Sequence, residues 1–181
     1  MRILKVIAQV VGLIVLVYGV GMFTIYLDKR NEDGPSILFP GGELVSGDLH
    51  QGPDPDWGFT DDVFTIELQL DETGTSRRIF VMESDGKLYV PSGYMRSTLG
   101  RLWKNWAFVA DEGDGLAVAR IEGVRYARQL KRLTSGPAID GVVAKMAEKY
   151  RQGDTSPEDL AQARKAVEVG EIWLFEMAPR A

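Results

Sequence analysis

The residues best suited to chemistry lie in one connection, residues 94 to 106. It carries three cations, two hydroxyls and three large aromatic rings: Arg96, Arg101, Lys104, Ser97, Thr98, Tyr94, Trp103 and Trp106. No acid occurs from Gly86 to Ala110, although the whole chain has a formal net charge of −5. Cations and hydroxyls are the donor set that a phosphate requires, and aromatic rings can cover a flat ring system. The pattern therefore predicts a phosphate-holding rim. In the alternative, the tryptophans are the buried face of a helical turn and the cations face solvent.

The amino-acid composition excludes several other kinds of catalytic or metal site. The chain has no cysteine, and His50 is its only histidine, which excludes thiolate nucleophiles, disulfides and multi-histidine metal sites. The short motifs of phosphate loops, dinucleotide sites, serine hydrolases and zinc proteases are absent, so no catalytic residue is assigned. We interpret the acids of residues 54–62 as a solvated loop, and no metal site is predicted. The acidic balance of the chain argues against nucleic acid as a partner.

The N-terminal region is strongly apolar. Val6 to Leu27 form a run of 22 residues without a charge, and a helix of this length reaches about 33 Å, enough to cross a bilayer core. A cleaved signal peptide is the alternative, but its apolar region is usually shorter and ends at a small-residue cleavage site. We therefore predict a single-pass anchor over residues 1–30 in the inner (cell) membrane. The count of flanking basic groups favours a soluble domain outside the cytoplasm.

The remainder of the chain predicts one domain. Residues 31–42 mix charge, glycine and proline and are expected to form a tether, with the folded domain over residues 43–181. Alternating apolar residues in "DVFTIELQL", hairpin turns at Asp85-Gly86 and Glu122-Gly123, and a closing "EIWLFEM" indicate antiparallel strands. Two helices are expected, one over "PAIDGVVAKMAEKYRQ" and one opening at Ser156. The predicted fold class is mainly β (α+β): a closed or half-closed antiparallel barrel with two inserted helices, preceded by one transmembrane helix.

The order of these segments resembles a known family. "DDVFTIEL", "RRIFVMESDGKLYVPSG", the basic connection, "GLAVARIEGVRYARQLKRL" and a closing "WLFEM" resemble the pyridoxamine 5′-phosphate oxidase-like split barrels, which bind FMN or a deazaflavin. The resemblance covers about residues 41 to 178. It implies a homodimer, and a flavin phosphate held by Arg78, Ser97, Arg101 and Lys104, with Trp103 or Trp106 lining the site.

The sequence is compatible with three functions. The first is a membrane-anchored flavin- or deazaflavin-dependent oxidoreductase of unknown substrate. The second is a non-enzymatic, membrane-tethered interaction module without a cofactor. The third is a heme-binding barrel that would use His50 as an axial ligand. An absorption spectrum of the purified protein separates the three.

Overall fold

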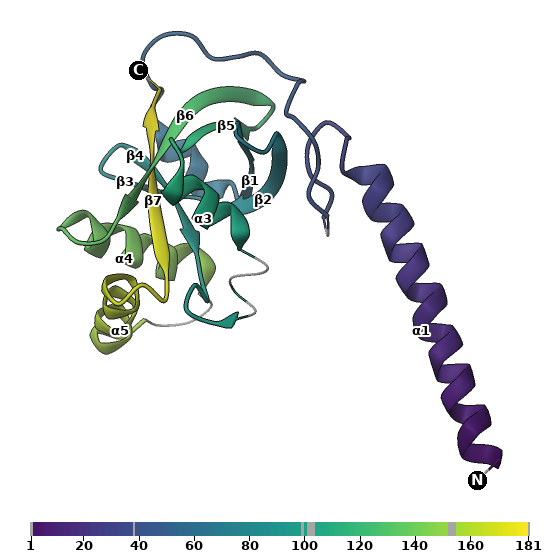
Figure 1. The fold of residues 1–181 in the computed structure, drawn as a ribbon. Helices are drawn as coiled ribbons and strands as arrows, with labels where there is room; N and C mark the ends of the chain where they lie inside the picture. Colours follow the sequence, from purple (N-terminus) through teal and green to yellow (C-terminus); the bar gives the residue numbers. More distant parts are fainter. Residues whose placement is uncertain (1, 38, 99, 101–103, 152–154, 181) are drawn as a thin grey trace.

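A computed structural model describes residues 2–37, 39–98, 100, 104–151 and 155–180. It begins with one long helix, α1 (Arg2–Lys29), which buries none of its residues and projects away from the rest of the chain (Figure 1). The mean hydropathy of its most apolar stretch is 2.4. By length and composition, α1 can cross a membrane.

The folded domain is built on one antiparallel sheet of seven strands. In chain order these are β1 (Thr65–Leu70), β2 (Thr75–Phe80), β3 (Met82–Ser84), β4 (Lys87–Ser92), β5 (Leu116–Ile121), β6 (Val124–Leu133) and β7 (Trp173–Pro179). Their order in the sheet is β2-β1-β5-β6-β7-β4-β3. The sheet curls until β2 contacts β4 without pairing with it, which leaves a half-barrel with a split between these two strands. The half-closed antiparallel barrel predicted from the sequence is confirmed.

The two predicted hairpin turns set the register of this sheet. Asp85 and Gly86 have φ angles of 52° and 72°, and Glu122 and Gly123 have φ angles of 48° and 82°. Two successive residues with positive φ are the requirement of a two-residue type I′ turn, whose twist matches that of the flanking strands. Both turns are therefore as predicted.

One predicted strand is interrupted. The run "RRIFVMES" was expected to form a single strand, but β2 pairs with β1 and β3 pairs with β4, so the chain crosses the split at Val81. The hydroxyl of Tyr150 accepts from the Val81 amide at 3.0 Å and lies 2.7 Å from the Val81 carbonyl oxygen, to which the Lys149 ammonium also donates at 2.9 Å. These side chains take the place of the strand-to-strand hydrogen bonds that Val81 lacks. The buried N–H and C=O of Val81 would cost free energy if they had no partner. Burial raises the pKa of Tyr150 to about 12.

The sheet packs on both of its faces. The inner core is enclosed by the curl and includes Leu68 and Phe175, and a second core lies between the outer face of β3, β4 and β7 and two helices. These helices are α4 (Ala138–Tyr150) and α5 (Pro157–Glu168), which lie together at one end of the domain (Figure 1). Both were predicted, and Ser156 caps α5 as expected. The short helix η1 (Trp57–Asp62) was not predicted, and α3 (Asn105–Glu112) was anticipated only as a helical turn in the alternative interpretation of the tryptophans.

The segment that follows α1 is bonded to the barrel. Asp33 accepts from Arg120 at 2.7 Å, and Arg120 also donates to Glu67 of β1 at 2.6 Å. Gly41 and Ser76 exchange two backbone hydrogen bonds at 3.0 Å. Hydrogen bonding to Ser46, together with the Val45 amide and Arg120, lowers the pKa of Asp33 to about 2. The described residues between 31 and 46 are thus bonded to β2 through Gly41 and to β5 through Asp33.

Candidate functional site

The split between β2 and β4 contains a pocket of about 560 Å³. Its walls come from Thr65 of β1, from β2, from Pro91 of β4, from the start of α3 and, after α1, from Ser36, Ile37, Phe39 and Pro40. Proline lacks a backbone N–H and suits a strand edge that has no partner, which is the position of Pro91 beside the split. The pocket is within the size range of sites that bind drug-sized ligands.

Arg77 is the most unusual residue of this pocket. Alternation along β2 places it on the same face as the buried Ile79, and across the ladder it pairs with the buried Leu68. It is thus a cation on the core side of the sheet. Its Nη2 donates to the Thr75 hydroxyl at 3.2 Å, but its Nε is buried and has no hydrogen-bond partner among the described residues. Burial lowers the pKa of Arg77 to about 10, so the guanidinium stays charged near neutral pH.

Lys104 adds a second cation at the start of α3. It occupies the N-cap position and makes no side-chain capping bond, and the first turn of α3 contains no acid. The N-terminal end of a helix carries partial positive charge and normally attracts an acidic or polar cap. Burial, together with the nearby charge of Arg77, lowers the pKa of Lys104. Two cations therefore converge on the positive end of a helix.

No acid in the described part of the chain forms an ion pair with the cations of this pocket. Arg77, Arg78 and Lys104 form no ion pair with any described residue, whereas Arg120, Arg128, Arg132 and Arg180 each pair with an aspartate. Unpaired, partly buried cations cost free energy, and an anion with several oxygens would offset that cost with charge-assisted hydrogen bonds. The electrostatics of the pocket thus favour a phosphate or a similar anion.

The rest of the pocket lining is largely apolar. Ile37, Phe39 and Phe80 contribute side chains, and Trp106 forms part of the wall while it is only 4% exposed. The ring of Trp106 packs against Phe175 at 5.6 Å between centroids, and the Arg77 guanidinium lies over it at 5.7 Å. Trp106 is therefore a core residue that also bounds the pocket. It fits both interpretations of the sequence, as a buried tryptophan on a helical turn and as an aromatic wall of a site.

The structure brings together three of the six predicted site residues. Arg78, Lys104 and Trp106 line the pocket. Ser97 does not, because its hydroxyl donates to the Tyr94 carbonyl at 2.9 Å and accepts from the Gly100 amide at 2.8 Å, which closes a local turn. Arg101 and Trp103 lie outside the described residues.

Arg77 is the residue that sequence reasoning missed. The signal was present in "TSRRIF": if Ile79 points into the core, period-two alternation puts Arg77 on the same face and directs Arg78 outward. Arg78 is exposed, in agreement with that alternation.

The heme hypothesis depended on His50. Its Nε2 lies 2.8 Å from the Pro53 carbonyl oxygen, and because a carbonyl only accepts, this nitrogen carries the proton. The ring packs against Tyr126 at 5.1 Å. Only Nδ1 is left for an iron, so the geometry does not favour an axial heme ligand. Within the described ranges, no group of three or more histidine or acidic residues is placed to hold a metal ion.

Comparisons with known proteins give similarities of fold. No protein-family model and no curated protein matches the chain. Among solved structures, the chain is similar to the conserved hypothetical protein Rv2991 from Mycobacterium tuberculosis, with 13% identity and a TM-score of 0.49 over 74% of this chain and 84% of that one. It is also similar to a Listeria innocua protein provisionally named a pyridoxamine 5′-phosphate oxidase, with 12% identity and a TM-score of 0.37 over 65% of this chain and 85% of that one.

The fold and the site together define a class. The chain is a split-barrel domain with a cationic pocket at its split, joined to an apolar helix long enough to span a membrane.

Proposed function

We propose that this protein binds the phosphate of a flavin, FMN or a deazaflavin, in the pocket at the split of the barrel. The observation that carries the proposal is Arg77 beside the uncapped, cationic start of α3: its Nε is buried without a described hydrogen-bond partner, as in Arg128 and Arg180, but unlike those two arginines it also has no ion pair with a described residue. A dianionic phosphate would accept from Arg77 and Lys104 and would lie at the positive end of the helix. Arg78 stands at the rim, and Arg101 remains a predicted ligand.

When bound, the flavin would carry out the transfer of electrons or of a hydride. This chain would hold its phosphate through Arg77 and Lys104 and would shelter an apolar ring against Ile37, Phe39 and Phe80. An oxidoreductase of unknown substrate is the activity proposed, and a homodimer is its proposed assembly. The same domain without a cofactor would be an interaction module.

The test compares two ligands that differ by one phosphate. FMN and riboflavin are titrated separately into the domain without its anchor, and their fluorescence is followed. If Arg77 and Lys104 each make one charge-assisted bond of about 1.5–3 kcal/mol to the phosphate, FMN should bind roughly a hundredfold to ten-thousandfold more tightly than riboflavin. Arg77→Met and Lys104→Met should reduce this ratio, and Arg101→Ala tests the remaining predicted cation.

Lys131→Met is the matched control, because Lys131 is an exposed cation on β6 that does not line the pocket. It should leave the ratio unchanged. If neither flavin binds the wild-type domain at micromolar concentrations, the flavin proposal fails and the interaction module takes its place.

We further propose that α1 anchors the domain in the inner membrane. An exposed apolar helix of 28 residues supports this, because such a surface is costly to leave in water. The basic-residue count favours a domain outside the cytoplasm, although a flavin is more easily loaded inside. Membrane fractionation tests the anchor. Reporter fusions at the C-terminus test on which side of the membrane the domain lies. If only the reporter that works in the cytoplasm is active, the domain is cytoplasmic and the proposed orientation is wrong.

A further inference from the structure

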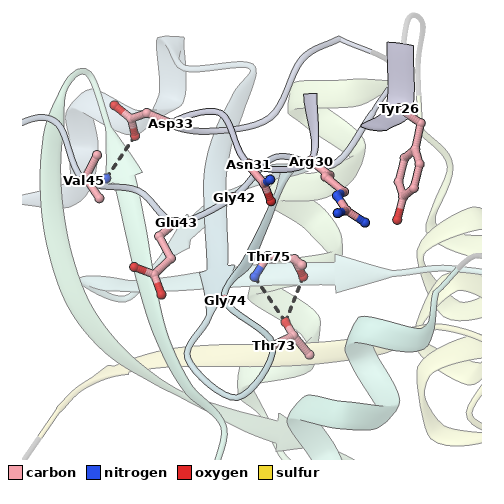
Figure 2. A pocket seen from close by; sticks show the side chains of 10 residues that line it. All are labelled: Tyr26, Arg30, Asn31, Asp33, Gly42, Glu43, Val45, Thr73, Gly74 and Thr75. Atoms are coloured by element: carbon pink, nitrogen blue, oxygen red, sulfur yellow. Dashed lines mark hydrogen bonds between the residues drawn. The ribbon is translucent and has the colours of Figure 1, made fainter. Parts of the chain in front are cut away.

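A second pocket lies between the C-terminal end of α1 and the turn that joins β1 to β2. It has a volume of about 490 Å³ and is separate from the cationic pocket. Figure 2 shows Tyr26 and Arg30 at the end of the helix, Glu43 on the segment that follows, and Thr73 and Thr75 on the turn between β1 and β2. Three separate parts of the chain therefore line one open, solvent-accessible hollow.

The position of this pocket along α1 sets its depth in a membrane. The uncharged run ends at Leu27, and Arg30 continues the helical hydrogen-bond pattern, with its amide 3.0 Å from the Tyr26 carbonyl oxygen. Three further residues advance the chain by about 4.5 Å. The polar layer on each side of a bilayer core is about 5–8 Å thick. With α1 across the membrane, Arg30 lies among the lipid headgroups.

The pocket carries one cation and one acid that are not paired. Within the described residues, the side chains of Arg30 and Glu43 have neither an ion pair nor a hydrogen bond, although the neighbouring Lys29 pairs with Glu32 at 2.7 Å. Figure 2 shows Arg30 and Glu43 on different walls, with the hydroxyls of Thr73 and Thr75 below and between them. Opposite charges held apart across a polar space match a ligand that is itself zwitterionic.

We propose that this pocket binds the headgroup of a zwitterionic phospholipid that carries a primary amine, as in phosphatidylethanolamine. The lipid phosphate faces Arg30, and the ammonium faces Glu43. A primary ammonium donates three hydrogen bonds, which the Glu43 carboxylate and the threonine hydroxyls accept. A quaternary ammonium has no N–H to donate, and a purely anionic headgroup would meet the repulsion of Glu43. The site depends on the proposed anchoring by α1 and is independent of flavin binding.

The test uses the full-length protein in a mild detergent. Phosphatidylethanolamine, phosphatidylcholine and phosphatidylglycerol with identical acyl chains are added in equal amounts, and retained lipid is identified by native mass spectrometry. Wild-type protein should retain phosphatidylethanolamine preferentially. A cation near lipid phosphate contributes about fivefold in binding, so Arg30→Gln should lower phosphatidylethanolamine retention about fivefold. Glu43→Gln should remove the preference over phosphatidylcholine.

Two matched controls separate this site from lipid that merely surrounds the helix. Lys29→Gln removes the adjacent cation, and Glu72→Gln removes a nearby acid, and neither residue lines the pocket. Both variants should behave as wild type. Equal retention of the three lipids, a preference for phosphatidylglycerol, or the same loss in Lys29→Gln as in Arg30→Gln would overturn the proposal. Flavin titration of the same preparations reports separately on the split of the barrel.

Discussion

Arg77 lies over the ring of Trp106, with its Cζ 5.7 Å from the ring centroid. The ring is fixed in turn by Phe175 in the inner core, so the cation is held by a rigid part of the barrel. A guanidinium placed over an indole gains a modest attraction, but this does not replace the hydrogen bond that its buried Nε lacks. Part of the proposed anion site is thus already in place in the unliganded protein, at a cost to its stability.

This relationship predicts that Arg77→Met has opposite effects on stability and on binding. Methionine keeps the apolar stem and removes the unpaired charge, so the unliganded domain should be as stable as wild type or up to about 1–3 kcal/mol more stable. FMN affinity should fall about tenfold to a hundredfold. Urea unfolding of the unliganded domain and a fluorescence titration measure the two quantities. A loss of stability with unchanged affinity would make Arg77 a structural residue only.

Lys104 predicts a pH dependence with a definite sign. Its folded-state pKa is lowered from 10.5 by burial and by Arg77. Between the lowered folded-state pKa and 10.5 the unfolded chain therefore binds more protons at this site than the folded chain does. It follows that the contribution of Lys104 to the free energy of unfolding rises as pH climbs through the lowered pKa toward 10.5.

The measurement is the difference in unfolding free energy between wild type and Lys104→Met at about pH 8 and about pH 10, without ligand. The unfolding free energy of wild type should rise relative to that of Lys104→Met between the lower and the higher pH. A difference that does not change with pH, or that shifts toward the methionine variant, would contradict the assigned environment of Lys104.

The pair of Arg128 and Asp54 predicts a large effect on stability away from either pocket. Arg128 is 2% exposed, donates two hydrogen bonds to Asp54 at 2.6 and 2.9 Å, and lies over the Trp57 ring at 4.9 Å. Asp54→Ala leaves a buried guanidinium without its partner and should cost about 3 kcal/mol. The more exposed pair of Arg132 and Asp111 is the control, for which Asp111→Ala should cost about 1 kcal/mol or less. Equal costs in thermal unfolding would contradict this assignment.

The sequence was most informative where short-range rules apply. The two hairpin turns follow from residue pairs that accept positive φ, and α5 follows from the cap at Ser156. The break at Val81 could not be predicted, because it is stabilised by Tyr150, which is 69 residues away in the sequence. Helix α3 is only eight residues long, and its helical state depends on packing of Trp106 and Ala107 into the barrel.

The candidate site was predicted only in part for the same reason. The acid-free stretch drew attention to Lys104, which lines the pocket, since a charge imbalance is visible in composition. The partner cation Arg77 comes from a different strand, and only the curl of the sheet brings it to the start of α3.

The contacts of residues 31–46 predict that truncations at residue 30 and at residue 46 will differ in stability. Removal of residues 1–30 should give a soluble domain of unchanged stability, because α1 buries none of its side chains. Removal of residues 1–46 should be destabilising, since Leu44 is 2% exposed, its amide donates to Gln69 at 2.7 Å, and Gly42 accepts from the Ser76 hydroxyl at 2.6 Å.

Loss of the Leu44 side chain and of these hydrogen bonds should together cost about 3 kcal/mol, or about 10 °C in melting temperature for a domain of this size. The shorter truncation is the matched control for the longer one, and Leu44→Ala in the shorter form should reproduce most of the loss. If the two truncated domains melt at the same temperature, residues 31–46 act as a free tether and their contacts with the barrel contribute no stability.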